Sequence, residues 1–301
     1  MKTIINLLLI VISIIFCSCE KTITITPPSY LSRPSVQSML EPDSVPIVYF
    51  NRTVPYFNEN LLFRDLVIRN AQIKIQSSTG TDSLKLDSVY DKSFCQYNYY
   101  YKGNTPVQLN KTYTLTIKNG ADNYTATCQT SQLKPVIDST GYIPEFFDLY
   151  GGHEGVIVYY KDIPSQINYY RYEMDRYVDT STLQAFVKVK ASPCLVGRDS
   201  ALFHELGRSV YADEGIVQGQ QIKIVIEPAY THVKGTRGLV YIQAIDKNAY
   251  IFFDQLDKQK LTQRNPFVEP VFLRDGQFGN KAVGYFSAMV KSNGVLFIFP
   301  E

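Results

Sequence analysis

Two pairs of neighbouring histidine and glutamate residues have side chains that a metal-dependent hydrolase uses. They are His153-Glu154 and His204-Glu205. In the corresponding zinc proteases a helix carries a second histidine four residues after the first, so that both rings bind one ion. Here isoleucine and arginine stand at those positions. The sequence therefore predicts no metal site of this kind.

Other patterns that would indicate catalysis are also missing from the sequence. It contains neither a Walker phosphate-binding loop nor a GxSxG nucleophile motif. A triad of Ser, His and Asp from distant positions stays open, although no motif indicates one. The chain has 30 Lys and Arg against 28 Asp and Glu, and this net charge of +2 lacks the basic excess of a nucleic-acid-binding protein. We expect a protein without catalytic activity, cofactor, metal or nucleic-acid partner.

The N-terminal segment carries a more specific chemical signal. Lys2 is followed by an apolar run at residues 4–16, which is shorter than the about 20 residues of a membrane-spanning helix and is typical of a secretory signal peptide. Ser18-Cys19 ends this segment as the lipobox of bacterial lipoproteins does, whereas Cys17 follows a bulky phenylalanine. We predict that residues 1–18 are a signal peptide and that Cys19 is acylated and anchors the mature chain to membrane lipid. The alternatives are a cleaved soluble protein and a buried N-terminal helix.

The remaining cysteines leave their pairing open. With Cys17 and Cys19 assigned to processing, the chain retains Cys95, Cys128 and Cys194, and no CxxC motif or zinc spacing occurs. Cys95 and Cys128 lie in one predicted domain, and an exported protein permits a disulfide between them. Free, buried thiols are the alternative, and we favour it.

Aromatic residues are abundant, with 23 Tyr and 17 Phe but no Trp. Two tyrosine clusters stand out, one at residues 97–101 and the other at residues 169–172. They could stack on sugar rings or contact a partner protein. Alternating core and surface positions on strands are the alternative, which we favour, and the absence of Trp weakens the sugar interpretation further.

Period-two alternation predicts a fold built mostly from strands. The clearest case is a hairpin in which residues 112–118 and 123–128 flank Asn119-Gly120, because both turn residues tolerate a positive φ. Tyr113, Leu115 and Ile117 share its core face. Further strands are expected at residues 46–51, 71–77, 83–86, 94–101, 155–160, 168–177, 182–190, 220–227, 238–245 and 295–299.

Turn-forming residues divide the chain into segments. Residues 19–34 are rich in Thr and Pro and predict an extended, lipid-anchored tether. A boundary at residues 134–141 contains Pro and Gly and follows the complete hairpin. We therefore expect an N-terminal β-sandwich domain at 35–134 and a C-terminal β-rich domain at 142–301, both immunoglobulin-like.

One segment near the C-terminus has helical rather than strand periodicity. Asp246 can cap a helix whose residues Ala249, Phe252, Phe253 and Leu256 share one face, and which stops before Asn265-Pro266. Residues 279–288 contain no acidic residue, histidine or cysteine. We expect this segment to pack against the helix, with its two glycines providing a turn or a close approach between backbones.

Several segments in order resemble the domain of unknown function 4249 family, lipoproteins of the Bacteroidota. They are residues 19–21, 50–57, 111–117, 168–172, 218–220, 246–250, 265–267 and, most specifically, GNKAVGYFSA at 279–288. The resemblance implies two β-sandwich-like domains on an outer-membrane anchor and frequent association with TonB-dependent transporters. It implies no activity and no catalytic residues.

These observations together predict a lipid-anchored outer-membrane accessory or binding protein without catalytic activity, associated with a TonB-dependent transporter. A surface glycan-binding or adhesive module is the alternative. The sequence leaves open whether the protein faces the periplasm or the cell surface.

Overall fold

The structure is a computed structural model that describes residues 31–54, 63–92, 95–148, 151–179, 200–212, 219–227, 233–262, 271, 273 and 275–301. The predicted signal peptide, Cys19, most of the tether, the strand expected at 182–190 and the helix stop at Asn265-Pro266 lie outside these residues. No helix within them is long and apolar enough to cross a membrane.

Residues Ser32–Glu301 form one compact unit made mostly of β-strands. The large sheet contains β1 (Pro34–Leu40), β2 (Ile47–Arg52), β3 (Gln72–Ser77), β4 (Gly80–Asp91), β5 (Gln96–Lys102), β6 (Thr112–Asn119), β7 (Asp122–Gln129), β10 (Tyr169–Asp179), β11 (Ser200–Ala212), β13 (Arg237–Ile245), β14 (Val283–Lys291) and β15 (Val295–Ile298). The small sheet contains β8 (Val136–Asp148), β9 (Gly151–Lys161) and β12 (Gln221–Ile226). The helices are α2 (Phe63–Leu66) and α4 (Lys247–Thr262).

The predicted mostly-β class and the short helix near the C-terminus are thus confirmed, and the sheets show how the strands are arranged. The large sheet has the order β11-β10-β13-β14-β1-β2-β5-β4-β3-β6-β7, with β15 paired to β13, and the small sheet has the order β12-β9-β8. β8 begins at Val136, so part of the predicted connection at 134–141 is strand. The division into two domains at 35–134 and 142–301 stays a prediction.

The β6–β7 hairpin confirms the strongest local prediction and shifts its turn by one residue. Asn119 pairs with Asp122, so Gly120 and Ala121 form the loop. Gly120 has a φ of 61° and Asn119 does not have a positive φ. A positive φ at the first loop position alone is the pattern of a type II′ turn. The predicted core face is correct, because Tyr113, Leu115 and Ile117 are buried.

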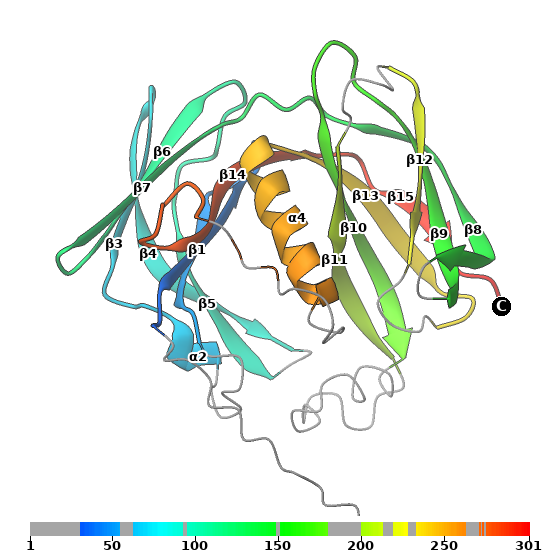
Figure 1. Cartoon of the computed structure of the whole chain (residues 1–301), viewed down its shortest axis with the longest axis horizontal. Helices are drawn as coiled ribbons and strands as arrows, with labels where there is room; N and C mark the ends of the chain where they lie inside the picture. Colours follow the sequence, from blue (N-terminus) through cyan, green and yellow to red (C-terminus); the bar gives the residue numbers. More distant parts are fainter. Residues whose placement is uncertain are drawn as a thin grey trace, which may run out of the picture. The chain divides into compact units, whose positions relative to one another are not determined.

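The first and the last long strands of the large sheet lie side by side. β1 pairs in parallel with β14, from Ser35 opposite Val283 to Leu40 opposite Ala288, as the adjacent blue and red strands show (Figure 1). β1 also pairs with β2 in antiparallel orientation. Val36 and Leu40 are fully buried, because they project from the face of β1 that packs in a hydrophobic core cluster. This pair joins strands from opposite ends of the chain.

A glutamine side chain connects β7 to β14 near the end of the large sheet. Gln277 Nε2 donates a hydrogen bond to the Thr127 carbonyl oxygen at 2.8 Å. Its Oε1 accepts a hydrogen bond from the Phe286 backbone N–H, also at 2.8 Å. The Gln277 side-chain amide therefore provides hydrogen bonds to a carbonyl of β7 and an N–H of β14, which the backbone of a neighbouring strand would otherwise supply.

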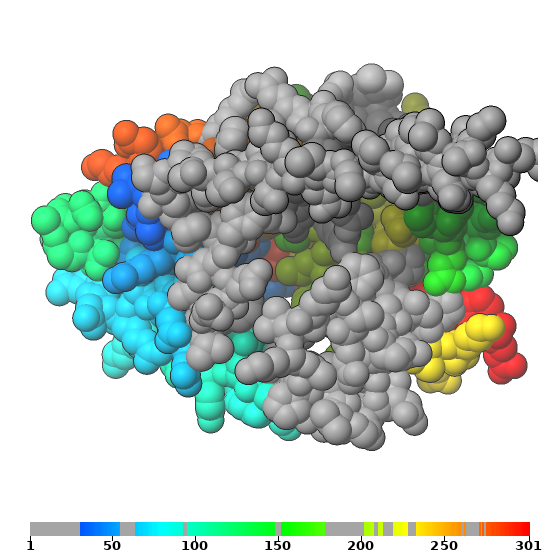
Figure 2. Space-filling view, turned by 60° about the horizontal axis from the view of Figure 1, so that its bottom comes forward, coloured from blue at the N-terminus to red at the C-terminus, as the bar shows by residue number. Residues whose placement is uncertain are grey.

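The apolar core consists of separate clusters. One lies among β1–β7 and β14 and includes Phe50, Leu115 and Phe286. Another lies among β8–β10, β12, β13 and β15 and includes Tyr160 and Phe299. Phe297 and Phe299, near the C-terminus, belong to this second core cluster. The Gly235 N–H donates a hydrogen bond to the Phe299 carbonyl oxygen at 3.1 Å. The red C-terminal residues accordingly lie beside the yellow ones in the space-filling view (Figure 2).

The predicted helix and the segment at 279–288 pack against each other, as expected. α4 contacts β10, β11 and β14, and its residues Ala249 and Phe253 are buried. The Tyr285 ring lies 5.0 Å from the Phe252 ring and 5.1 Å from the Phe253 ring, measured between centroids. Desolvation by this packing raises the pKa of Tyr285 to about 12.

Truncation of this tyrosine tests the packing role. We expect Tyr285→Ala to lower the free energy of unfolding by about 3 kcal/mol, since it removes an aromatic ring from its contacts with α4. For a chain of this size that corresponds to a decrease of roughly 6–12 °C in Tm by thermal unfolding. Tyr285→Phe keeps the ring and serves as the control. An unchanged Tm combined with loss of partner binding would instead identify a contact site.

Candidate functional site

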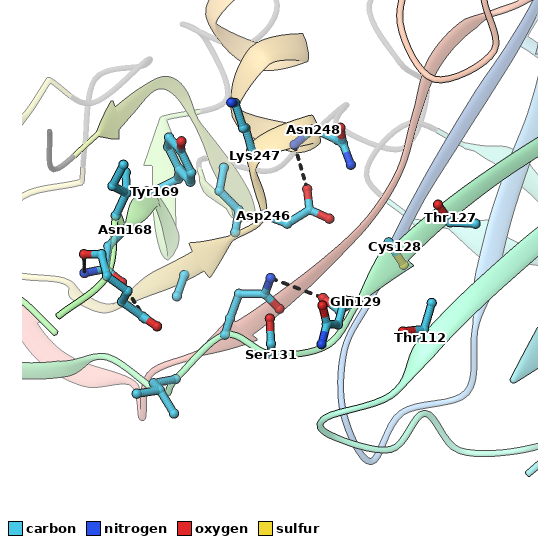
Figure 3. Close-up of a pocket in the computed structure, with 16 residues that line it drawn as sticks. Thr112, Thr127, Cys128, Gln129, Ser131, Asn168, Tyr169, Asp246, Lys247 and Asn248 are labelled. Atoms are coloured by element: carbon cyan, nitrogen blue, oxygen red, sulfur yellow. Dashed lines mark hydrogen bonds between the residues drawn. The ribbon is translucent and has the colours of Figure 1, made fainter. Parts of the chain in front are cut away.

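A cavity of about 460 Å³ lies where β7, the connection after it, the start of β10 and the N-terminus of α4 meet (Figure 3). This volume is within the roughly 300–1,000 Å³ range of small-molecule sites. The lining residues are mainly amides, hydroxyls and aliphatic groups: Thr112, Thr127, Cys128, Gln129, Ser131, Gln132, Leu133, Gln166, Ile167, Asn168, Tyr169, Ala244, Ile245, Asp246, Lys247 and Asn248.

Asp246 is the acidic residue among the described lining residues, and it caps α4 as predicted. Its Oδ1 accepts hydrogen bonds from the backbone N–H of Asn248 at 2.9 Å and of Ala249 at 3.0 Å, and a further bond from the Ser287 hydroxyl. Its Oδ2 accepts a bond from the Ala288 N–H at 3.2 Å. Burial raises the pKa of Asp246, although these hydrogen bonds act in the opposite direction. The carboxylate therefore joins α4 to β14 and has a structural role.

Asn168 has its hydrogen bonds satisfied by the protein itself. Its Nδ2 donates to Asp162 Oδ1 at 3.1 Å and to the Ile163 carbonyl at 2.6 Å, while its Oδ1 accepts from Gln166 Nε2 at 2.7 Å. Tyr170 donates to the same Asp162 oxygen at 2.8 Å. This network fixes the start of β10 as one wall of the cavity.

Gln132 occupies the opposite wall and is only partly satisfied. Its Nε2 donates to the Gln129 carbonyl oxygen at 3.3 Å. Its Oε1 is buried and has no hydrogen-bond partner among the residues that the structure describes. An unpaired buried acceptor lowers the stability of the folded state by about 1–3 kcal/mol, and a hydrogen-bond donor that reaches the acceptor removes this cost.

The two histidine–glutamate pairs lie on strands, where their side chains contact other residues of the protein. Strand alternation directs His204 and Glu205 to opposite faces of β11, where His204 Nδ1 lies 2.6 Å from Asp175 Oδ1 and Glu205 contacts buried Arg176. His153 Nδ1 lies 3.2 Å from Glu227 Oε1. The described part of the chain contains no group of three His, Cys, Asp or Glu residues that could hold a metal ion.

The cysteines differ from the favoured expectation at one position. Cys128 is free and buried, as expected, and burial raises the pKa of its thiol, which makes it unreactive. Cys95 is disulfide-bonded, which corrects the expectation of a free thiol there, and its partner lies outside the described residues. Since Cys128 is free, the pairing of Cys95 with Cys128 is excluded.

The tyrosine clusters divide between core and surface. In the second cluster Tyr170 and Tyr172 are buried. In the first cluster Tyr101 is buried and donates to the Ile68 carbonyl at 2.8 Å, whereas Tyr97 is 53% exposed. Alternating positions on strands therefore explain most of both clusters, and none of the first cluster lines the cavity.

Comparison with known families identifies the chain. A family model described as a domain of unknown function (DUF4249) matches residues 20–293. The chain belongs to this family. No curated protein matches it in sequence. The DUF4249 match includes every residue that lines the cavity.

The cavity of this DUF4249 chain was not predicted from the sequence. Its residues come from positions 112 to 248, on β6, β7, β10, β13 and α4. Asp246 was predicted as a helix cap, because capping depends on neighbouring residues, while Tyr169 and Cys128 were singled out only as part of a tyrosine cluster and as a cysteine. Gln129, Gln132 and Asn248 belong to no local motif, so no signal in one sequence would have grouped them.

Proposed function

We propose that this DUF4249 protein is a lipid-anchored, non-catalytic accessory or binding protein of the outer membrane that associates with a TonB-dependent transporter. The observation that carries the binding role is the cavity near the N-terminus of α4. Amides and hydroxyls from separate segments surround it, while its carboxylate, Asp246, accepts four hydrogen bonds from the protein. Such an arrangement suits recognition of a ligand better than proton transfer, which needs a positioned acid or base free to react.

Two further observations support export and anchoring. The apolar run at 4–16 ends at Ser18-Cys19, the pattern of an acylated lipoprotein. Cys95 is disulfide-bonded, and disulfides persist in oxidising compartments outside the cytosol. The transporter partner follows from the resemblance to outer-membrane lipoproteins, and the periplasmic and cell-surface faces both permit it.

Acylation of Cys19 is tested by metabolic labelling with a fatty-acid analogue. We expect label on the wild-type protein and none on Cys19→Ala, because the acyl chains are attached to this residue and its new N-terminus. Cys17→Ala is the matched control and should retain the label. Equal labelling of wild type and Cys19→Ala would contradict the anchor.

Fractionation and co-isolation extend the same experiment to the partner. Wild-type protein should sediment with the outer membrane and, after mild cross-linking, should be isolated with a TonB-dependent transporter. The Cys19→Ala protein should be lost from that membrane fraction. Isolation of anchored wild-type protein without any transporter would overturn the association and leave the anchor intact.

A further inference from the structure

Most of the polar side chains around the cavity have no hydrogen-bond partner within the described part of the chain. They come from β6, β7, the connection after β7 and the first turn of α4, and include hydroxyl and amide groups: Thr112, Thr127, Gln129, Ser131 and Asn248. Hydroxyl and amide groups can each donate and accept. A ligand that fits them must therefore offer several donors and acceptors of its own.

Charge is nearly absent from the inside of the cavity. Asp246 and Lys247 are the charged residues among the described lining residues. The Asp246 carboxylate is engaged by backbone N–H groups and the Ser287 hydroxyl, as described above. The Lys247 amino group is directed away from Gln129 and Ser131 (Figure 3). No ionic group is thus placed to bind a charged ligand.

Two exposed aliphatic side chains complete the lining. Leu133 is 51% exposed and Ile167 is 60% exposed, and they belong to the two walls that Gln132 and Asn168 also form. When a ligand covers an exposed leucine or isoleucine, the burial of apolar surface favours binding by about 25 cal/mol per Å². The ligand therefore needs an apolar surface as well as hydrogen-bonding groups.

A sugar ring combines these properties, since hydroxyl groups surround its edge and C–H groups form its faces. We infer that the cavity binds a neutral carbohydrate, whose hydroxyls meet Thr127, Gln129 and Asn248 while a C–H face packs on the aliphatic rim. This inference rests on the proposed binding function and names its ligand class. Gln132 also lines the cavity, and its Oε1 lacks a donor within the described part of the chain.

Calorimetric titration of the mature, acylated protein in a detergent without a sugar headgroup tests the inference. The probes are glucose, galactose, mannose, N-acetylglucosamine, maltose and cellobiose, with glucuronic acid and glucosamine as charged counterparts. We expect binding of at least one neutral sugar at micromolar to millimolar Kd. The charged counterparts should bind about tenfold more weakly, since a lone ionic group would be desolvated without a partner.

Variants at the cavity locate the site. Thr127→Val and Gln129→Leu each remove hydrogen-bonding groups from an exposed position on β7 at similar side-chain volume. Each should weaken binding of the neutral sugar about tenfold, the equivalent of one lost hydrogen bond, with an unchanged Tm. Gln37→Leu is the matched control, an exposed glutamine on β1 outside the cavity, and should bind as wild type does.

Three results would overturn the inference: no binding of any neutral sugar in the panel, tighter binding of the charged sugars, or unchanged binding by both cavity variants. The proposed function fails separately, by loss of the Cys19 anchor or of the transporter. Cys19→Ala released from the membrane should still bind the sugar with wild-type affinity, because Cys19 is not among the residues that line the cavity.

Discussion

A Gly284→Ala variant is expected to lose about 4 kcal/mol or more of unfolding free energy, an unusually large effect for one methyl group. Gly284 lies opposite Val36 in the parallel pair of β1 and β14. A Cβ atom built on Gly284 would lie 1.8 Å from the Val36 carbonyl oxygen and 2.8 Å from its carbonyl carbon. Since these are backbone atoms, no side-chain rotation relieves the overlap. The two strands would have to separate.

The backbone conformation of Gly284 adds to this effect. Its φ of 121° is one that residues with a Cβ rarely adopt. Gly279→Ala is the matched control, because Gly279 also has a positive φ, 57°, but has no atom within 4 Å of a built Cβ. It should cost about 1–2 kcal/mol from conformation alone. We expect Tm to fall by about 10 °C or more for Gly284→Ala and by much less for the control. Equal decreases would show that the close approach does not determine stability.

The sequence predicted elements whose signals are local. The β6–β7 hairpin follows from alternation over residues 112–128, and the beginning of α4 follows from the Asp246 cap and the spacing of Ala249 and Phe253. The expectation that glycines at 279–288 provide a turn and a close approach is also confirmed, by Gly279 and Gly284 respectively. The hairpin and the helix start depend on residues that are neighbours in the chain, whereas the close approach at Gly284 involves Val36 on β1 and was predicted only from the residue type.

Elements that depend on distant partners were not predicted. β1 and β14 pair across about 250 residues, and a parallel pair has no connecting turn that a local sequence motif could indicate. β8 contains Pro, Gly and charged residues without alternation, so its strand conformation depends on pairing with β9. The cavity combines both difficulties, since its walls come from strands and a helix whose contacts no local pattern specifies.

Arg176 shows how strand alternation can mislead about burial. Tyr170, Tyr172, Met174 and Arg176 occupy one face of β10, and that face points into the second core cluster. A charged residue at the end of such a series is usually exposed, because burial of an unpaired charge is costly. Here the Arg176 side chain is fully buried. Its partner, Glu205, lies on β11, which the sequence did not indicate as a strand.

Loss of Glu205 alone is expected to be the second severe substitution. Arg176 Nε and Nη2 donate to Glu205 Oε2 at 3.0 and 2.9 Å, and the Tyr172 hydroxyl donates to Oε1 at 2.9 Å. Glu205→Leu leaves the guanidinium buried without a counter-charge from the described part of the chain. Breaking a buried ion pair in this way costs about 3–5 kcal/mol, which chemical denaturation will measure.

The triple variant Tyr172→Phe, Arg176→Met, Glu205→Leu separates the value of the ion pair from the cost of breaking it. It removes the hydroxyl and both charges together, and Arg176 Nη1 already lacks a hydrogen-bond partner among the described residues. Apolar side chains of similar volume avoid the desolvation of both ions, so the triple variant should recover most of the stability lost by Glu205→Leu. A triple variant as unstable as the single one would show instead that the pair itself stabilises this core, because neither charge of the pair would then remain to explain the loss.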